Sequence, residues 1–331
     1  MTSANRQVVL LSRPDGAVSV ANFQLRESTI PALAAGEVLV RSLYLSIDPW
    51  LRTAMNHAAL LPLDTVVPGD VVGCVTHSRH ALFRSGDIVQ GLLGWQDYVA
   101  APWYLLRKID PRAAPITTAL GLLGSSGLTA YIGLYHVGRI APRETVVISG
   151  AAGAVGSAAA QLATLTGCQV IGIAGSEDKV RYLSDDLGLH AALNYKAEPA
   201  WRSQLSVQSP FGVDMYFDNV GGRVSDAVVP VLTTKSRVVV CGQIASYERR
   251  MPTSRLPWLG VILEKRIRVE GFLVSDYGEY LPAALQALTM LWRAGLLRSR
   301  ETIARGLENA PEAFVSMLCG GNVGKQLVQV D

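Results

Sequence analysis

The feature that most constrains the fold is the stretch VVISGAAGAVGSAAAQLA at residues 146–163. A short, mainly apolar run is followed by a turn containing Ala151, Gly153 and Gly156, and then by helix-forming residues. This pattern predicts a buried strand, a tight turn and a helix. Gly153 would let the backbone approach a pyrophosphate, and Gly156 would let the helix pack closely on the strand. The stretch therefore predicts a dinucleotide site, with Ala151 in place of the first glycine of the usual pattern.

The texture of the chain changes near residue 125. Short β-type runs separated by Gly, Pro and Asp come before it, and apolar strands alternate with helical stretches after it. Such alternation is typical of right-handed crossovers and a parallel sheet. We therefore predict an α/β protein, with a strand-rich domain followed by a Rossmann-type, doubly wound parallel sheet. The segment from about residue 300 is again strand-like, and pattern alone does not assign it to either domain.

Composition narrows the class of protein. With 331 residues and 49% hydrophobic residues, the chain can bury more than one core. Lysine and arginine number 30 against 27 acidic residues, and no basic block suggests a nucleic-acid partner. The N-terminus lacks the pattern of a secretory signal, and no run of about 18 apolar residues suggests a membrane span. Four widely spaced cysteines, Cys74, Cys168, Cys241 and Cys319, favour a reducing cytoplasm.

The end of the next strand indicates which dinucleotide binds. Enzymes that use NAD commonly carry a carboxylate there, about 20 residues past the glycines, to bind the ribose 2′-hydroxyl. This chain has Gly175 and Ser176, with Lys179 one helical turn onward. A carboxylate would repel a 2′-phosphate, so its absence favours NADP. Glu177 and Asp178 oppose this on charge, unless they only cap the following helix.

Other catalytic patterns fit poorly. GGNVGKQ at residues 320–326 resembles a nucleotide-triphosphate loop, but its spacing is short and Gln326 replaces the hydroxyl residue. Tyr104 and Lys108 have the spacing of a short-chain reductase pair, yet they precede the dinucleotide pattern. The cysteines and histidines lack the spacing of a zinc site, so we expect no metal. GSSGLTAY only approximates a serine nucleophile turn.

Without zinc or an acidic tyrosine–lysine pair, reduction of a carbon–carbon double bond conjugated to a carbonyl is the economical reaction. Hydride then goes to the β-carbon, charge develops on an enolate oxygen, and one hydrogen-bond donor can stabilise it while water protonates the α-carbon.

Many segments resemble one family in order along nearly the whole chain. They are LYLSIDPWLR, GLLGWQDYV, LGLLGSSGLTAYIGL, SGAAGAVGS, GSEDKVRYL, NYK, VDMYFDNVGG, VVVCGQIASY, EGFLV and ARGLENAPEAFVSMLCGGNVGKQLVQV. The chain is similar to the zinc-free medium-chain dehydrogenases/reductases of the prostaglandin reductase and bacterial curcumin reductase type. The resemblance implies a GroES-like catalytic domain at residues 1–124, completed by residues 300–331, and a Rossmann NADP-binding domain at 125–299.

The same resemblance implies roles for individual residues. Tyr247 would donate a hydrogen bond to the substrate carbonyl, unless it is only an aromatic that packs on the cofactor. The NADP(H) contacts would be Thr129, Gly153, Ala154, Val155, Gly156, Ser176, Lys179, Tyr195, Asn219, Cys241, Gly242, Gln243, Ile244, Phe272, Leu273, Val274 and Asn322. Asn322 lies in GGNVGK, so this motif would be a glycine turn that closes on the cofactor.

Substrate identity does not follow from the resemblance. The family often has tyrosine where this chain has Trp50, followed by Leu51. Tyr44, Trp50, Trp95 and Tyr277 are candidates for the substrate pocket, and each is equally a candidate core residue. An NADPH-dependent enone or enal reductase is our first hypothesis. An NADPH quinone reductase and a non-catalytic NADPH-binding protein are the alternatives, and a homodimer is expected from the family.

Overall fold

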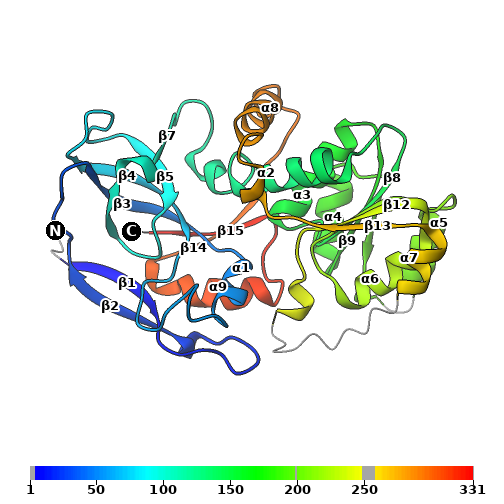
Figure 1. The fold of residues 1–331 in the computed structure, drawn as a ribbon, viewed down its shortest axis with the longest axis horizontal. Helices are drawn as coiled ribbons and strands as arrows, with labels where there is room; N and C mark the ends of the chain where they lie inside the picture. Colours follow the sequence, from blue (N-terminus) through cyan, green and yellow to red (C-terminus); the bar gives the residue numbers. More distant parts are fainter. Residues whose placement is uncertain (1–3, 198–199, 248–257, 331) are drawn as a thin grey trace. The chain divides into compact units, whose positions relative to one another are not determined.

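The computed structural model describes residues 4–197, 200–247 and 258–330. The chain divides into two compact units, one formed by Met1–Leu120 with Glu301–Asp331 and the other by Gly121–Arg300 (Figure 1). We call them the strand-rich unit and the parallel-sheet unit.

The strand-rich unit is built from both ends of the chain, with the first two strands paired in a small sheet and the other strands in a larger one. Its described elements are β1 (Ala4–Leu10), β2 (Phe23–Thr29), β3 (Glu37–Ser46), α1 (Trp50–Ala54), β4 (Asp70–Ser78), β5 (Ile88–Leu92), β6 (Tyr98–Pro102), β7 (Arg107–Ile109), β14 (Glu301–Arg305), α9 (Ala310–Leu318) and β15 (Lys325–Gln329). The larger sheet has the order β14-β15-β3-β4-β5-β7, with β6 also paired to β3. Since β15 pairs with β3, the last strand completes a sheet that begins near the N-terminus.

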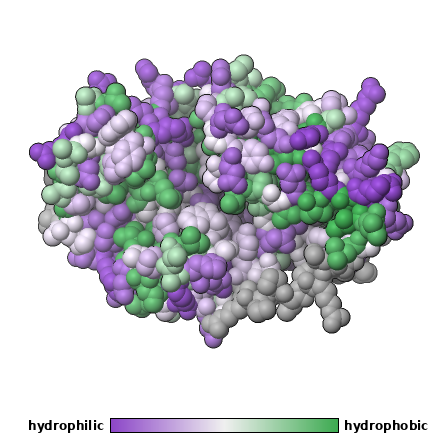
Figure 2. All heavy atoms as spheres, viewed as in Figure 1, coloured by the Kyte–Doolittle hydropathy of each residue, from purple (hydrophilic) through white to green (hydrophobic). Residues whose placement is uncertain are grey.

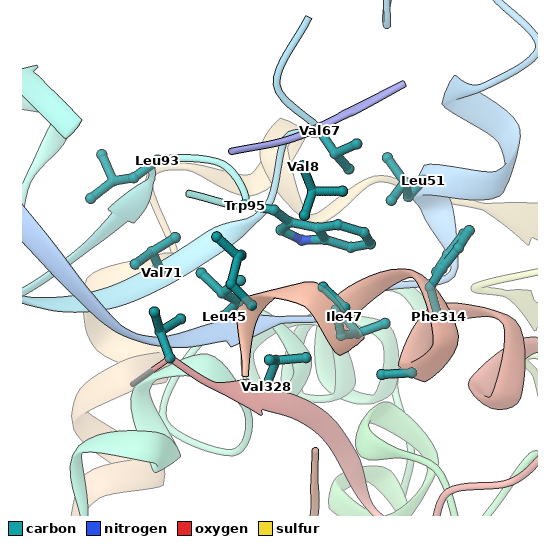
Figure 3. Close-up of a cluster of buried hydrophobic side chains, with 14 of the residues drawn as sticks. Val8, Leu45, Ile47, Leu51, Val67, Val71, Leu93, Trp95, Phe314 and Val328 are labelled. Carbon is teal, nitrogen blue, oxygen red and sulfur yellow. The ribbon is translucent and has the colours of Figure 1, made fainter. Parts of the chain in front are cut away.

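Trp95 lies within the hydrophobic core of the strand-rich unit. The Trp95 side chain is fully buried, and aliphatic residues from several strands surround its indole ring (Figure 3). Phe23 and Phe314 lie about equally far from it, with ring centroids 6.0 and 6.1 Å away. The indole Nε1 donates to the Ser46 carbonyl oxygen at 3.3 Å, so its one polar group is satisfied.

The parallel-sheet unit has the doubly wound order. Its described elements are α2 (Ser125–Tyr131), β8 (Thr145–Ser149), α3 (Ala154–Leu165), β9 (Gln169–Ala174), α4 (Glu177–Arg181), β10 (Ala191–Asn194), α5 (Ala200–Gln208), β11 (Val213–Asp218), α6 (Gly222–Val228), β12 (Leu232–Val240), α7 (Leu259–Lys265), β13 (Arg268–Gly271) and α8 (Leu281–Arg293). The sheet runs β10-β9-β8-β11-β12-β13, and every neighbouring pair is parallel. Figure 1 shows α2, α3 and α8 on one side of it and α6 and α7 on the other.

The buried strands explain why this sheet forms. Val146, Val147 and Ile148 of β8 are fully buried, as expected for a strand covered by helices on both faces. The strand order reverses between β8 and β11, which places the ends of these two strands side by side. In doubly wound sheets, ligands bind at this reversal, beyond the carboxyl ends of the strands. The predicted α/β class, with its Rossmann sheet and strand-rich domain, is confirmed.

On the viewed face, hydrophilic and hydrophobic residues are interspersed, with hydrophobic residues gathered in places (Figure 2). In the parallel-sheet unit, the edge strand β13 and helix α7 expose Val269, Leu259 and Leu263. No helix within residues 4–197, 200–247 and 258–330 combines the length and apolarity needed to cross a bilayer.

Candidate cofactor site and active site

The glycine turn has the geometry that a pyrophosphate needs. Strand β8 ends at Ser149, and Gly153 is the N-cap of α3. A Cβ added to Gly156 would lie 2.2 Å from the Gly150 carbonyl oxygen, so only glycine lets the helix approach the turn this closely. A Cβ at Gly153 would lie 3.2 Å from the same oxygen. The N-terminus of α3 therefore presents its amides beside an uncrowded backbone, which suits a bound phosphate.

The predicted 2′-phosphate residues follow two neighbouring strands, β9 and β10. Ser176 is the N-cap of α4 and its Oγ accepts from the Lys179 amide at 3.4 Å. Tyr195 follows β10, and a Cβ added to Gly175 would lie 3.0 Å from its ring. The absence of a side chain at Gly175 therefore leaves room for the Tyr195 ring beside the end of β9.

The two acidic residues of α4 are occupied by other partners. Glu177 accepts from Asn194 Nδ2 at 2.6 Å, and Asp178 pairs with Arg181 on the same helix. Both also lie in the first turn of α4, where negative charge is favourable. Both carboxylates therefore have partners within the unit, and their position at the start of α4 stabilises the helix.

Positive charge gathers around Tyr195. Burial lowers the pKa of Lys179, and the like charge of Lys196 lowers it further, so the two ammonium groups are near enough to repel each other. The Arg223 guanidinium lies 5.0 Å from the centroid of the Tyr195 ring. Sequence reasoning missed Lys196 and Arg223 as candidates. Lys196 belongs to the NYK motif and could have been found there. Arg223 has no local signal, because only the order of the strands in the sheet brings α6 close to Tyr195.

Asn219 ties the two strands at the sheet reversal. Its Nδ2 donates to the Ser149 carbonyl oxygen at 2.8 Å, and its backbone amide donates to Ser149 Oγ at 2.9 Å. The DNVGG loop is therefore fixed to the end of the strand that leads into the glycine turn.

The Tyr247 phenol lies just after the 3₁₀ turn Ile244–Ser246. Its oxygen accepts a hydrogen bond from the Gln243 amide at 3.2 Å. Burial raises the pKa of Tyr247, while the Gln243 hydrogen bond acts in the opposite direction. The phenol is therefore neutral near pH 7 and keeps its own proton to donate.

Cys241 is a free, weakly acidic thiol in the same run. Burial raises its pKa to about 12, and the Asp218 charge contributes to the shift. A thiol in this state is a poor nucleophile, which leaves Tyr247 as the chemically useful group here.

Two of the remaining candidates in the parallel-sheet unit, Phe272 and Tyr277, contact aromatic residues. Phe272 and Tyr277 contact edge to face, with ring centroids 6.2 Å apart, and Tyr277 also lies near His136 and Tyr280. Leu273 is 68% exposed. Thr129 is half-buried on α2.

In the strand-rich unit, Trp95 belongs to the core and Tyr44 packs against a smaller buried cluster. Trp50, at the start of α1, is 46% exposed and so has area to offer a ligand. Burial gives Trp95 a packing role in this unit, because a side chain with no exposed surface cannot touch a ligand.

The GGNVGKQ segment forms a turn whose side chains bond within the strand-rich unit. Asn322 Nδ2 donates to the Gly324 carbonyl oxygen at 2.8 Å. Lys325 is buried, and its Nζ lies 2.5 Å from Asp48 Oδ1 and 3.0 Å from the Ile47 carbonyl oxygen. The Lys325 ammonium therefore forms an internal ion pair with Asp48 and does not present its charge to a phosphate.

Among the described residues, no three histidine, cysteine or acidic side chains lie together as metal ligands would.

Comparisons with known proteins show similarity to oxidoreductases. A family model described as the N-terminal domain of oxidoreductase matches residues 6–109, and one described as zinc-binding dehydrogenase matches residues 154–290. The chain is 41% identical over 336 residues to the putative NADP-dependent oxidoreductase YfmJ of Bacillus subtilis, covering 100% of this chain and 99% of the relative. It is 38% identical over 335 residues to the NADPH-dependent curcumin reductase of Escherichia coli, covering 98% and 97%.

A mammalian relative and a solved structure are similarly close. Prostaglandin reductase 1 of Rattus norvegicus is 40% identical over 319 residues, covering 95% of this chain and 96% of the relative. The crystal structure of CurA in complex with NADPH from Vibrio vulnificus superposes with a TM-score of 0.93 at 39% identity, covering 98% of this chain and 99% of that one.

Proposed function

We propose that this chain, which belongs to the zinc-independent medium-chain dehydrogenase/reductase family, reduces the carbon–carbon double bond of α,β-unsaturated ketones or aldehydes with NADPH. The family includes relatives named for curcumin, 2-alkenals and pulegone, at 36 to 38% identity. These names share one reaction type, and their substrates differ widely in size and shape. The substrate of this chain therefore stays open between small alkenals, aryl enones and longer oxo-lipids.

The residues of the parallel-sheet unit fit NADPH. The amides at the start of α3 would hold the pyrophosphate, while Lys179, Lys196 and Tyr195 would hold the 2′-phosphate. When bound, NADPH supplies the hydride for the β-carbon of the substrate. Thr129, Phe272, Leu273, Val274 and Asn322 stay predicted contacts, as do Asn219 and residues 241–244.

One observation carries the catalytic assignment: the Tyr247 phenol is held by the Gln243 amide through its oxygen and keeps its proton. In our proposal this proton is offered to the substrate carbonyl oxygen, where negative charge develops as the β-carbon accepts hydride. A neutral donor at this point stabilises the enolate without metal. Water then protonates the α-carbon.

The reaction is tested by following NADPH oxidation with a panel of enones, enals, aryl enones and quinones, with NADH alongside. Tyr247→Phe should lower kcat for the best enone by about 10- to 100-fold, and should leave the Kd of NADPH within about twofold. An unchanged kcat would remove Tyr247 from the mechanism. Preferential turnover of quinones would favour the quinone reductase, and NADPH binding without turnover would favour a non-catalytic protein.

The cofactor assignment has a separate test. Lys179→Ala should weaken NADPH binding by about tenfold or more and NADH binding hardly at all, since only NADPH carries the 2′-phosphate. Arg181→Ala is the matched control, because Arg181 lies on the same helix and pairs with Asp178. Equal losses for both cofactors in Lys179→Ala would contradict the assignment.

We further propose that residues 1–124 with 300–331 supply the catalytic domain and residues 125–299 the NADP domain. Tyr44, Trp50 and Tyr277 remain candidates for the substrate pocket, and a cytoplasmic homodimer remains a prediction.

A further inference from the structure

The carboxylate of Asp218 gathers an unusual number of donors. It ends β11 at the sheet reversal and is 1% exposed. Oδ1 accepts from Ser149 Oγ at 2.8 Å, Tyr216 OH at 2.8 Å, the Val220 amide at 2.9 Å and the Gly221 amide at 2.8 Å; Oδ2 accepts from Ser225 Oγ at 2.7 Å and Gln243 Nε2 at 2.9 Å. All six donors are uncharged. A carboxylate makes stronger hydrogen bonds than a neutral acceptor, so this set fixes the surrounding loops firmly.

One of these donors leads directly to Tyr247. The Gln243 side chain is held by Asp218, and the Gln243 backbone amide donates to the Tyr247 oxygen at 3.2 Å. The backbone carbonyl of Asp218 also accepts from the Cys241 and Gly242 amides, at 2.8 and 3.0 Å. Asp218 therefore holds the segment before Tyr247 through both its side chain and its backbone.

Two glycines make room for this arrangement. Gly221 has φ +73°, and a Cβ added there would lie 2.1 Å from Gln243 Oε1. A Cβ added to Gly242 would lie 3.2 Å from the Tyr247 hydroxyl oxygen. The DNVGG and CGQIASY segments thus fit together so that Gln243 reaches Asp218 and the phenol reaches the Gln243 amide.

We propose that Asp218 and Gln243 are positioning residues, which set the place of the Tyr247 hydroxyl through the hydrogen bonds from Gln243 Nε2 to Asp218 and from the Gln243 amide to the phenol. The inference rests on the proposed function of Tyr247 as the donor to the substrate carbonyl. Only a single 3₁₀ turn separates Gln243 from Tyr247, so a shift of Gln243 moves the amide that holds the phenol oxygen. Small displacements of a catalytic group cost rate steeply.

A double-mutant cycle tests this proposal. Gln243→Met keeps the length of the side chain and removes its hydrogen bond to Asp218. With an enone substrate, it should lower kcat by about tenfold in the wild-type background and by less than about twofold in the Tyr247→Phe background. Because Gln243 is also a predicted NADPH contact, kcat is measured at saturating NADPH and the Kd of NADPH is determined separately. Any rise in that Kd should be the same in both backgrounds.

Three outcomes separate the possibilities. Equal loss of kcat in both backgrounds would overturn the proposal, because Gln243 would then act independently of Tyr247. A loss that appears in the Kd of NADPH and not in kcat would overturn it too, because Gln243 would then act through cofactor binding alone. If Tyr247→Phe alone leaves kcat unchanged, the proposed function of Tyr247 fails, and the positioning proposal fails with it for that separately identified reason.

Two further variants complete the design. Asp218→Asn should lower kcat as Gln243→Met does, and combining the two should add less than about twofold, since both break the same link. Additive losses would count against the link, and if Asp218→Asn fails to fold, the Gln243→Met cycle still decides. Gln204→Met, at an exposed position of α5, controls for the substitution itself and should leave kcat and the melting temperature unchanged.

Discussion

Two aspartates, one in each unit, hold loops in place with partners of different chemistry. Asp218 in the parallel-sheet unit has the six neutral donors described above. Asp48 in the strand-rich unit accepts from the Lys325 ammonium at 2.5 Å and from the Ser46 hydroxyl. The Asp48 side chain is 22% exposed, whereas Asp218 is 1% exposed.

The difference separates two tasks. Lys325 and Asp48 are 277 residues apart in sequence, so their ion pair ties the last strand to the segment after β3. This cation neutralises the Asp48 carboxylate, but the carboxylate then fixes the position of few other groups. The donors of Asp218 fix several loop positions at once, at the edge where we expect chemistry. Neutral donors therefore suit a site that needs precision, and an ion pair suits chain closure.

The largest expected effect comes from deleting the Asp218 carboxylate. Asp218→Ala leaves six donors without their common acceptor in a buried place, so the free energy of unfolding should fall by about 3 to 5 kcal/mol. Urea unfolding measures this change. Ser225→Ala, which removes one donor and keeps the acceptor, is the control and should cost about 1 kcal/mol. Similar losses of unfolding free energy in the two variants would show that the Asp218 carboxylate does not hold several donors at once.

The next effect concerns the glycine that admits Gln243. Gly221 combines φ +73° with ψ −160°, a region that residues other than glycine avoid. Gly221→Ala should therefore lower the free energy of unfolding by about 3 kcal/mol, through backbone strain and the contact with Gln243.

Combining Gly221→Ala with Gln243→Ala isolates the contact. Removing the Gln243 side chain relieves the clash and leaves the backbone strain, so Gly221→Ala should cost about 1 kcal/mol less in that background. An unchanged cost would mean that only backbone strain matters at position 221.

The ion pair in the strand-rich unit should matter less. Lys325→Met removes the cation from Asp48, which can still reach water and the Ser46 hydroxyl. We expect a loss of about 2 kcal/mol in the free energy of unfolding, below the usual cost for a fully buried pair. Adding Asp48→Asn should recover about half of it, because position 48 then carries no unpaired charge. A double variant worse than the sum of the single ones would contradict this account.

Local sequence patterns predicted the elements around the sheet reversal, whereas the long-range contacts of Asp218 depend on strand pairing. Residues 146–163 are a local pattern of strand, turn and helix, and the structure has β8 and α3 there. The alternation of strands and helices likewise predicted the parallel sheet. The role of Asp218 was only partly visible in the sequence. Four of its donors lie between residues 216 and 225, but Ser149 and Gln243 are distant in sequence and reach it through the pairing of β11 with β8 and with β12.

Burial was equally hard to foresee. Trp95 and Trp50 both stand in segments with family resemblance, yet one is fully buried and the other is 46% exposed. Lys325 follows a glycine turn that resembles a phosphate loop, while its partner Asp48 lies near the other end of the chain. Contacts between distant segments depend on strand pairing, which a single sequence does not specify residue by residue.

The smallest expected effect distinguishes the same two regions by their thiols. Cys319 precedes the turn that carries Lys325 and is exposed, whereas burial and the Asp218 charge raise the pKa of Cys241 to about 12. Thiolate is the form that reacts with iodoacetamide, so at about pH 8 Cys319 should be alkylated long before Cys241. Asp218→Asn removes the negative charge and lowers the pKa of Cys241, but burial, the larger cause, persists. Peptide mass spectrometry should therefore show only a modest rise in Cys241 labelling, and labelling as fast as at Cys319 would mean that losing the carboxylate opens the whole segment.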